Sequence, residues 1–147
     1  IEHGCDQAVF LDAATQTFIE ELGGMNLFFV TKDNRLLTPE LTGSILEGVT
    51  RSSILDLGKE LGFDPQEQRI EIEQWKDGVA SGEIVEIFAC GTAAVVTPVG
   101  ELRWEGGSTP STAGAAGGEI TNAIRSRLLD IQYGRVEDTH GWLTQLA

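Results

Sequence analysis

Apolar residues follow two different spacings along the chain, and each spacing predicts one type of element. Apolar positions three or four residues apart indicate one face of a helix, whereas short apolar runs between turn residues indicate buried strands. Helical spacing predicts helices over residues 50–61, 73–80 and 119–132. Apolar runs predict strands over residues 7–12, 17–21, 26–30, 35–38, 83–90 and 95–99, with an alternating edge strand over 67–72. The pattern therefore predicts a mixed α/β fold.

Glycine and polar residues separate the predicted elements. The pair Gly23-Gly24 and the polar residues 31–34 divide the first forty residues into strands that follow one another as an antiparallel β-meander. Residues 100–118 are rich in glycine, serine, threonine and alanine, and they predict a loop with a short strand near Leu102 and Trp104. In the C-terminal tail, Trp142 is expected to pack into the core.

Residues 44–51 lead directly into the helix predicted over residues 50–61. Gly48 lets the backbone turn sharply, and its hydroxyl group makes Thr50 a candidate N-cap. A glycine bend, a hydroxyl group and the positive end of a helix dipole together suit the binding of an anion. The alternative interpretation is an ordinary capped helix without a ligand.

A second stretch of small residues, 91–94, lies between two predicted strands. Because Gly91, Ala93 and Ala94 carry little or no side chain, a ligand could touch the backbone, and consecutive free N–H groups could bind a carboxylate or phosphate. The alternative is a plain hairpin turn. The pair Gly117-Gly118 before the last helix could form a further anion site, although the need to cap that helix also explains it.

Composition and charge exclude several classes of function. The 147 residues suit one domain, and a formal net charge of −13 without a basic cluster argues against nucleic acid or an acidic membrane as partner. No apolar run in the sequence is long enough to cross a bilayer, and no signal-peptide pattern opens it. Cys5 and Cys90 lie far apart, which fits a reducing cytoplasm better than a long-range disulfide. His3 and His140 are isolated, so no metal site is expected.

The first residues indicate that the chain belongs to a longer protein. The chain starts without methionine, and residues 1–4 are typical of the last turn of a helix that ends at Gly4. The body of that helix is not in the sequence. We therefore expect residues 1–147 to be the C-terminal piece of something longer.

Four stretches that follow one another in the chain resemble a single enzyme family. They are residues 20–28 (EELGGMNLF), 43–51 (GSILEGVTR), 88–94 (FACGTAA) and 137–142 (EDTHGW). Together they resemble the C-terminal part of branched-chain amino-acid aminotransferases, which are fold-type-IV enzymes that depend on pyridoxal phosphate (PLP). The resemblance implies that residues 1–147 form the C-terminal large domain, with an antiparallel-rich β-meander or pseudo-barrel and flanking helices.

The resemblance also implies roles for individual residues. Glu21 would face the pyridine nitrogen of PLP and keep it protonated, although without the family Glu21 would be taken for a solvated surface carboxylate. Leu46 would pack against the cofactor ring. The residues that would hold the cofactor phosphate are Val49, Thr50 and Thr92, and Gly48 and Gly91 would also belong to the cofactor site. The residues whose turn would hold the substrate α-carboxylate are Thr92, Ala93 and Ala94.

The sequence departs from the family at several positions. The Schiff-base lysine of the family lies upstream of Ile1, in a K-x-G-G-N-Y sequence that this chain does not contain. None of the three lysines, Lys32, Lys59 and Lys76, matches it, so no catalytic residue is expected within residues 1–147. Some relatives carry a redox CxxC pair just after the Gly-Thr-Ala turn, where this chain has alanine and threonine.

The sequence thus predicts the PLP-dependent transfer of amino groups between branched-chain amino acids and 2-oxoglutarate in a full-length cytoplasmic enzyme. That enzyme would add an N-terminal domain and act as a homodimer or higher homo-oligomer, while the 147-residue piece alone would be inactive. Two alternatives stay open: a D-amino-acid aminotransferase or aminodeoxychorismate lyase of the same class, and a non-catalytic domain that binds a phosphorylated ligand.

Overall fold

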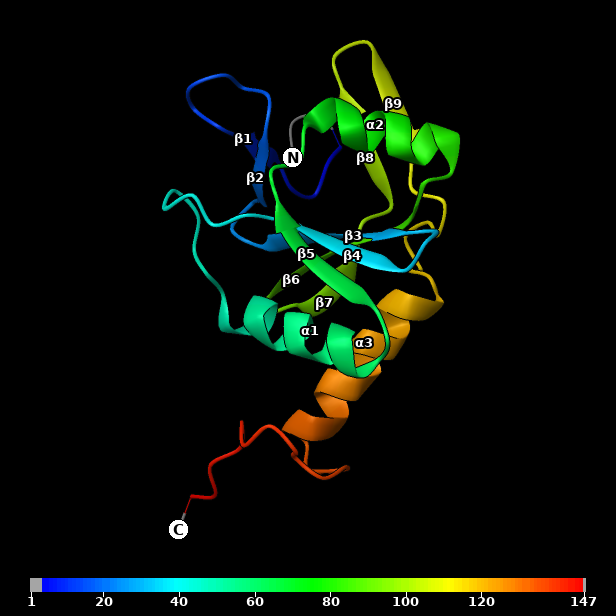
Figure 1. Ribbon diagram of the computed structural model, residues 1–147. Coiled ribbons are helices and arrows are strands. Elements are labelled where there is room, and N and C mark those ends of the chain that lie inside the picture. The colour runs from blue at the N-terminus through cyan, green and yellow to red at the C-terminus, as the bar shows by residue number, and fades with distance from the viewer. Residues whose placement is uncertain (1–3, 147) are drawn as a thin grey trace.

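A five-stranded sheet runs through the centre of the molecule (Figure 1). The computed structural model describes residues 4–146. Across the sheet the strands lie in the order β5 (Asp64–Gln68), β4 (Arg35–Pro39), β3 (Asn26–Thr31), β6 (Ile84–Gly91) and β7 (Val95–Pro98). β4 and β5 are parallel, and the other neighbouring strands are antiparallel.

Helices cover both faces of this sheet. α1 (Val49–Glu60) and α3 (Glu119–Gln132) lie on one face, and α2 (Ile72–Ser81) lies on the other (Figure 1). Successive residues of β3 point to opposite faces. Phe28 therefore stacks on Phe88 in the α1 and α3 core, with ring centroids 5.2 Å apart, whereas Phe29 meets Trp75 of α2 edge-on at 5.1 Å. Burial on both faces explains why this strand is almost continuously apolar.

Two short hairpins accompany the central sheet. β1 (Val9–Leu11) pairs with β2 (Ile19–Leu22), and β8 (Glu101–Trp104) pairs with β9 (Gly107–Pro110) beside α2. Asp12 closes the first hairpin by accepting hydrogen bonds from the backbone N–H groups of Phe18, Thr17 and Thr15 at 2.7–2.8 Å. These bonds, above all that from Phe18, hold the pKa of the Asp12 carboxyl well below its usual range.

The predicted α/β fold is confirmed, and three details of the prediction are wrong. The first forty residues are not one meander, because the β1–β2 hairpin lies outside the sheet that contains β3 and β4. β5 begins at Asp64 and ends at Gln68, earlier than predicted, and it is parallel to β4 at the sheet edge, where Pro65 is tolerated. Residues 100–118 are not a loop with one strand but contain the β8–β9 hairpin.

The start of α1 also differs from the prediction. The helix begins at Val49, and Gly48, with φ +70°, is its N-cap. Thr50 therefore lies inside the first turn, and no side chain caps the helix. Thr50 is not the N-cap because the positive φ needed to enter the helix falls on the glycine two residues earlier.

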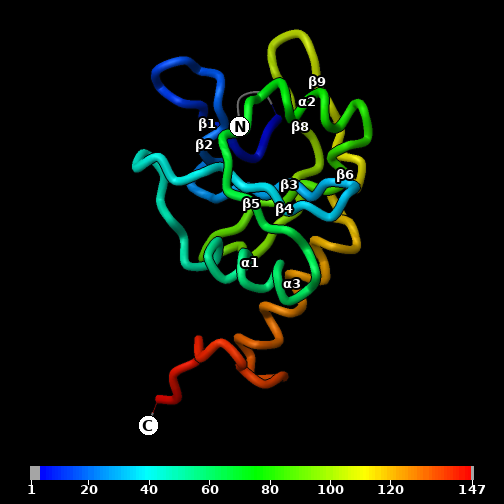
Figure 2. The backbone as a smooth tube through the Cα atoms, in the orientation of Figure 1, coloured from blue at the N-terminus to red at the C-terminus, as the bar shows by residue number. Residues whose placement is uncertain are grey.

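The C-terminal tail leaves α3 and turns toward α1 (Figure 2). His140 Nε2 lies 3.0 Å from Glu60 Oε2 at the end of α1, and the His140 ring stacks on Trp142. Trp142 is half-buried against the α1 and α3 core, as predicted. The helix end predicted at residues 1–4 consists mainly of residues 1–3, and these lie outside the described residues. No helix within residues 4–146 is long and apolar enough to cross a bilayer.

Candidate functional site

A cleft lies where β2, β3 and the β6–β7 turn meet the N-terminus of α1. Its lining residues are Glu21, Gly24, Asn26, Leu46, Gly48, Val49, Thr50, Cys90, Gly91 and Thr92. These include every residue that the sequence analysis assigned to cofactor binding. They come from three separate stretches of the chain, residues 21–26, 46–50 and 90–92, and the fold brings them to one place. The hollow is shallow, about 60 Å³, which is room for a few water molecules.

The N-terminus of α1 forms one wall of the cleft. The first N–H groups of a helix have no partner within it, and here the first to find one is that of Ser52, which donates to Gly48 O at 3.1 Å. No side chain caps this end, and no acidic residue lies in the first turn. The amides of Val49 and Thr50 are therefore available to an anion at the positive end of the helix dipole.

Asn26 fixes the loop that enters α1. This buried side chain at the start of β3 donates through Nδ2 to the carbonyl oxygen of Leu46 at 3.0 Å. A Cβ on Gly48 would lie 2.2 Å from Asn26 Oδ1, so only glycine allows the loop to lie this close to β3. Asn26 is not among the site residues predicted from the sequence, although a polar residue that opens an otherwise apolar strand is a signal that could have marked it.

Two large apolar side chains stand exposed at this end of α1. Leu46 is 78% exposed and Val49 is 86% exposed. Both side chains also line the cleft, so they offer apolar surface to a ligand there. Leu46, which is expected to pack against a cofactor ring, is thus free to do so.

The turn after β6 forms the opposite wall. Gly91 pairs with Val95 across the β6–β7 hairpin, and Thr92 lines the cleft. Within residues 4–146 the amides of Thr92 and Ala93 donate to no backbone carbonyl. Val95 leaves the turn with φ +58°, an unfavourable value for a β-branched residue that costs about 1–3 kcal/mol.

Ala93 and Ala94 lie in this turn next to the cleft without lining it. Ala93 is exposed and Ala94 is half-buried. The cofactor and substrate positions predicted at 91–94 are therefore adjacent, with Gly91 and Thr92 facing the cleft and the two alanines beyond it.

Glu21 projects from β2 into the cleft, where it is half-buried. Its neighbour Glu20 points to the other face of the strand and accepts a hydrogen bond from the Ser44 hydroxyl at 2.6 Å. The two adjacent carboxylates thus have different surroundings. Glu20 ties down the loop before α1, and Glu21 is the acidic group that lines the cleft.

Two further polar groups lie close to the cleft. Arg51 is only 3% exposed, and its guanidinium donates to Pro39 O at 2.9 Å and to Glu67 Oε2 at 2.6 Å. Cys90 lines the cleft, and burial raises the pKa of its thiol to about 12, with the charge of Arg51 acting weakly in the opposite direction. The thiol of Cys90 is therefore neutral and is not a nucleophile.

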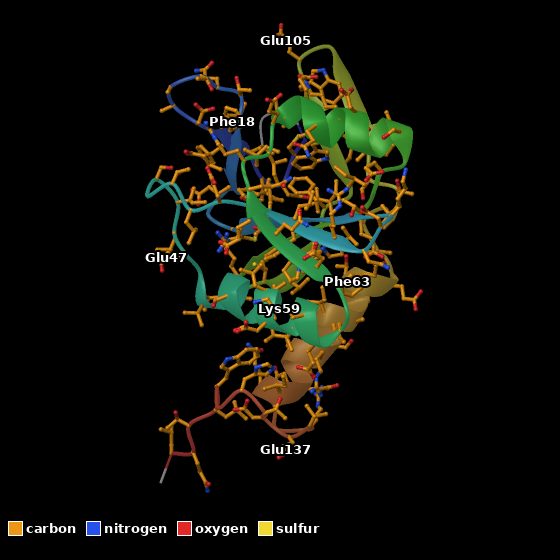
Figure 3. All side chains as sticks on the ribbon, in the orientation of Figure 1. Phe18, Glu47, Lys59, Phe63, Glu105 and Glu137 are labelled. Atoms are coloured by element: carbon orange, nitrogen blue, oxygen red, sulfur yellow. The ribbon has the colours of Figure 1, made fainter. Side chains whose placement is uncertain are left out.

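None of the described residues that line the cleft is a lysine. Lys32 pairs with Glu83 at 2.8 Å and Lys76 with Glu73 at 2.6 Å, both away from this site. Lys59 lies near the far end of α1, and its side chain is 68% exposed (Figure 3). The cleft thus offers donors for an anion and one carboxylate, without an amine that could bond a ligand covalently.

Comparisons with known proteins show the family to which the chain belongs. The chain matches the amino-transferase class IV family over residues 1–102. This chain belongs to the amino-transferase class IV family. It is 51% identical over 149 residues to the branched-chain-amino-acid aminotransferase of Mycobacterium tuberculosis, covering 99% of this chain and 40% of the relative. It is 50% identical over 144 residues to a probable branched-chain-amino-acid aminotransferase of Streptomyces coelicolor, covering 98% of this chain and 39% of the relative.

Two solved structures with a similar fold are branched-chain amino acid aminotransferases. The branched-chain amino acid aminotransferase from Thermobaculum terrenum in its PLP form has a TM-score of 0.78 and 31% identity, covering 97% of this chain and 42% of that one. The Escherichia coli enzyme has a TM-score of 0.79 and 35% identity, covering 98% and 44%. The chain thus has the fold of fold-type-IV aminotransferases and spans about 40% of the length of the curated relatives that it matches.

Proposed function

We propose that residues 1–147 are the C-terminal large-domain part of a branched-chain amino-acid aminotransferase. The full-length enzyme would transfer amino groups between leucine, isoleucine or valine and 2-oxoglutarate. The observation that carries this proposal is the cleft in which the fold gathers Glu21, Leu46, the start of α1 and the turn at Gly91 and Thr92. Relatives that are about 50% identical over nearly all of this chain bear the name of that activity.

The residues of the cleft fit PLP. The free amides of Val49 and Thr50 and the hydroxyl groups of Thr50 and Thr92 suit its phosphate, and Leu46 suits one face of its ring. Glu21 would hold a proton on the pyridine nitrogen. When bound, PLP supplies an electron sink for the negative charge that develops when the substrate loses a proton. PLP is larger than the hollow, so these residues would contact it along one side.

The turn after β6 suits the substrate α-carboxylate. The amides of Thr92 and Ala93 donate to no backbone carbonyl of the described chain, and Ala94 adds no bulky side chain beside them. The backbone of Val95 at the exit of this turn is strained, and strain of this kind clusters at ligand-binding sites. Preorganised donors of this kind stabilise an anion without a cost of reorganisation.

The lysine that bonds the cofactor, and the rest of the substrate pocket, would come from outside residues 1–147. The proposed partners are the N-terminal domain of the same enzyme, a second copy in a homodimer or higher oligomer, and the amino-acid and 2-oxo-acid substrates. Cys90 is a buried cysteine outside any disulfide, which is compatible with a reducing cytoplasm, where we place the enzyme.

The test uses a full-length enzyme that carries residues 1–147. Amino transfer to 2-oxoglutarate is measured with L-leucine, L-isoleucine and L-valine as donors and with D-alanine for comparison. We expect turnover with the three branched-chain donors and little with D-alanine. Preferred turnover of D-alanine would assign the chain to a D-amino-acid aminotransferase. PLP binding without any amino transfer would assign it to a non-catalytic binding protein.

A further inference from the structure

Arg51 occupies an electrostatically unfavourable position. It is the third residue of α1, and its guanidinium is buried near the positive end of the helix dipole, where a cation is destabilising. Burial adds a desolvation cost that one good ion pair only partly offsets. Its partner, Glu67, has a side chain that is 47% exposed, so water weakens the compensation.

The hydrogen bonding of Arg51 is incomplete as well. The guanidinium donates through one terminal nitrogen to Pro39 O and Glu67 Oε2, while the buried Nε atom has no partner within the described chain. Buried polar groups in native proteins are rarely left in this state. A buried cation that is only partly paired keeps much of its electrostatic potential, which acts on whatever lies nearby.

The cleft lies next to this charge. The Cβ of Arg51 is 3.4 Å from the position that a Cβ on Gly48 would occupy, so the base of this side chain lies against the cleft wall, and the Arg51 charge acts to lower the pKa of the Cys90 thiol. Gly48 and Cys90 both line the cleft, so Arg51 lies behind its wall at the point where the amides of Val49 and Thr50 are free. The potential of Arg51 therefore adds to that of the helix N-terminus at this wall.

We propose that Arg51 is a positioning residue for the phosphate of the ligand, acting through its charge from behind the cleft wall, and that Glu67 moderates this charge. The proposal rests on the function proposed above, because it takes the start of α1 as the phosphate site. An anion in the cleft would supply the compensation that Arg51 lacks in the protein. Arg51 thus lowers the stability of the ligand-free chain and raises its affinity for a phosphate group.

The alternative role for Arg51 is a mechanical one, in which it ties α1 to β4 and β5 through Pro39 and Glu67. The two roles give opposite predictions for Glu67. If the ion pair serves as a tie, weakening it at either end loosens α1 and lowers phosphate affinity. If Arg51 acts through its charge, Glu67→Gln exposes more of that charge and raises the affinity.

The test measures binding of inorganic phosphate to the 147-residue chain by titration calorimetry, at low ionic strength and at a pH where phosphate is a dianion. We expect Arg51→Gln to lower the affinity about tenfold and Glu67→Gln to raise it about threefold, magnitudes typical of charges at this range in a protein. Arg51→Lys should keep most of the affinity. Glu73→Gln, which removes a paired carboxylate on α2, is the matched control and should have no effect.

Thermal unfolding without phosphate shows whether each variant folds, and we expect Arg51→Gln to unfold at no lower temperature than the parent. A fall in affinity in Glu67→Gln, or equal affinity in this variant and the parent, would overturn the charge role while the phosphate site stands. If the parent chain binds no phosphate and no PLP, the phosphate site itself is wrong, and the role of Arg51 falls with it.

Discussion

Several residues in or beside the cleft depart from the most stable local choice, which supports the anion site proposed above. Gly48 adopts a positive φ and lies against Asn26, where a side chain would clash. Val95 carries backbone strain at the exit of the opposite turn. The first amides of α1 are left without a cap, although a capping side chain would add about 1 kcal/mol of stability. Local departures from the most stable choice cluster at functional sites.

A substitution of Thr50 tests whether its hydroxyl group binds the cofactor phosphate. Because the Thr50 side chain does not cap α1, Thr50→Val should leave the free energy of unfolding within about 0.5 kcal/mol of the parent value. The lost hydrogen bond to a charged phosphate should weaken PLP binding by about 1.5–3 kcal/mol. Fluorescence titration with PLP measures this, with Ser52→Ala in the same helical turn as the control. Equal affinity in Thr50→Val and the parent would show that the hydroxyl does not contact the phosphate.

A substitution of Glu21 tests whether this residue contacts the pyridine nitrogen of the cofactor. In the full-length enzyme, Glu21→Gln should leave PLP bound but lower turnover by a factor of about 100 or more, because an uncharged amide cannot hold the proton on the pyridine nitrogen. The neighbouring Glu20→Gln, whose side chain contacts Ser44 instead, is the control and should keep most of the turnover. Wild-type turnover in Glu21→Gln would remove the residue from the cofactor site.

Elements with strong local signals are those that the sequence predicts well. The helix predicted over residues 119–132 coincides with α3, because an apolar face follows a pair of glycines. β5 and the β8–β9 hairpin were misjudged because their side chains are mostly polar and half-exposed, so the apolar pattern that marks a strand is weak. Their backbone pairing depends on contacts with neighbours that are distant in the sequence.

Site residues likewise divide into those with a local sequence signal, which could be predicted, and those defined by contacts between distant residues, which could not. Gly48 and Thr92 lie in short stretches whose chemistry is local, and the family resemblance pointed to Glu21. Asn26 and Arg51 act through Leu46, Pro39 and Glu67, and these contacts exist only in the folded chain. Sequence patterns of short range contain no information on such contacts.

The start of α3 provides a test of stability that is independent of the cleft. The buried carboxylate of Glu86 accepts hydrogen bonds from the Ile120 and Thr121 amides, at 3.0 and 2.7 Å, and from the Thr121 hydroxyl at 2.7 Å. Glu86→Gln places an amide donor against these donors and should lower the free energy of unfolding by about 1–3 kcal/mol. Urea unfolding measures this loss.

Glu105→Gln serves as the control for that experiment, since Glu105 is exposed at the tip of the β8–β9 hairpin (Figure 3). It removes the same charge without breaking a buried contact, so its unfolding midpoint should stay close to that of the parent. Equal midpoints for the Glu86 and Glu105 variants would show that the Glu86 carboxylate does not stabilise α3.

For the molecule as a whole, the proposed role of the cleft is to hold one side of a ligand. Its walls offer hydrogen-bond donors suited to a phosphate, a carboxylate and an exposed apolar side chain, that of Leu46. Its volume is small, and none of the described residues that line it is a lysine. The chain spans about 40% of the length of its curated relatives. These facts fit a domain that positions a cofactor, with the covalent attachment and the rest of the enclosure supplied by another part of the enzyme.

The most direct test of this account is incubation of the purified 147-residue chain with PLP, followed by borohydride reduction and mapping of any modified lysine. We expect weak binding that free phosphate competes away, scattered low labelling of Lys32, Lys59 and Lys76, and no leucine-dependent turnover. Stoichiometric labelling of one of these lysines together with leucine-dependent turnover would contradict the account, because the cofactor would then be attached within this chain.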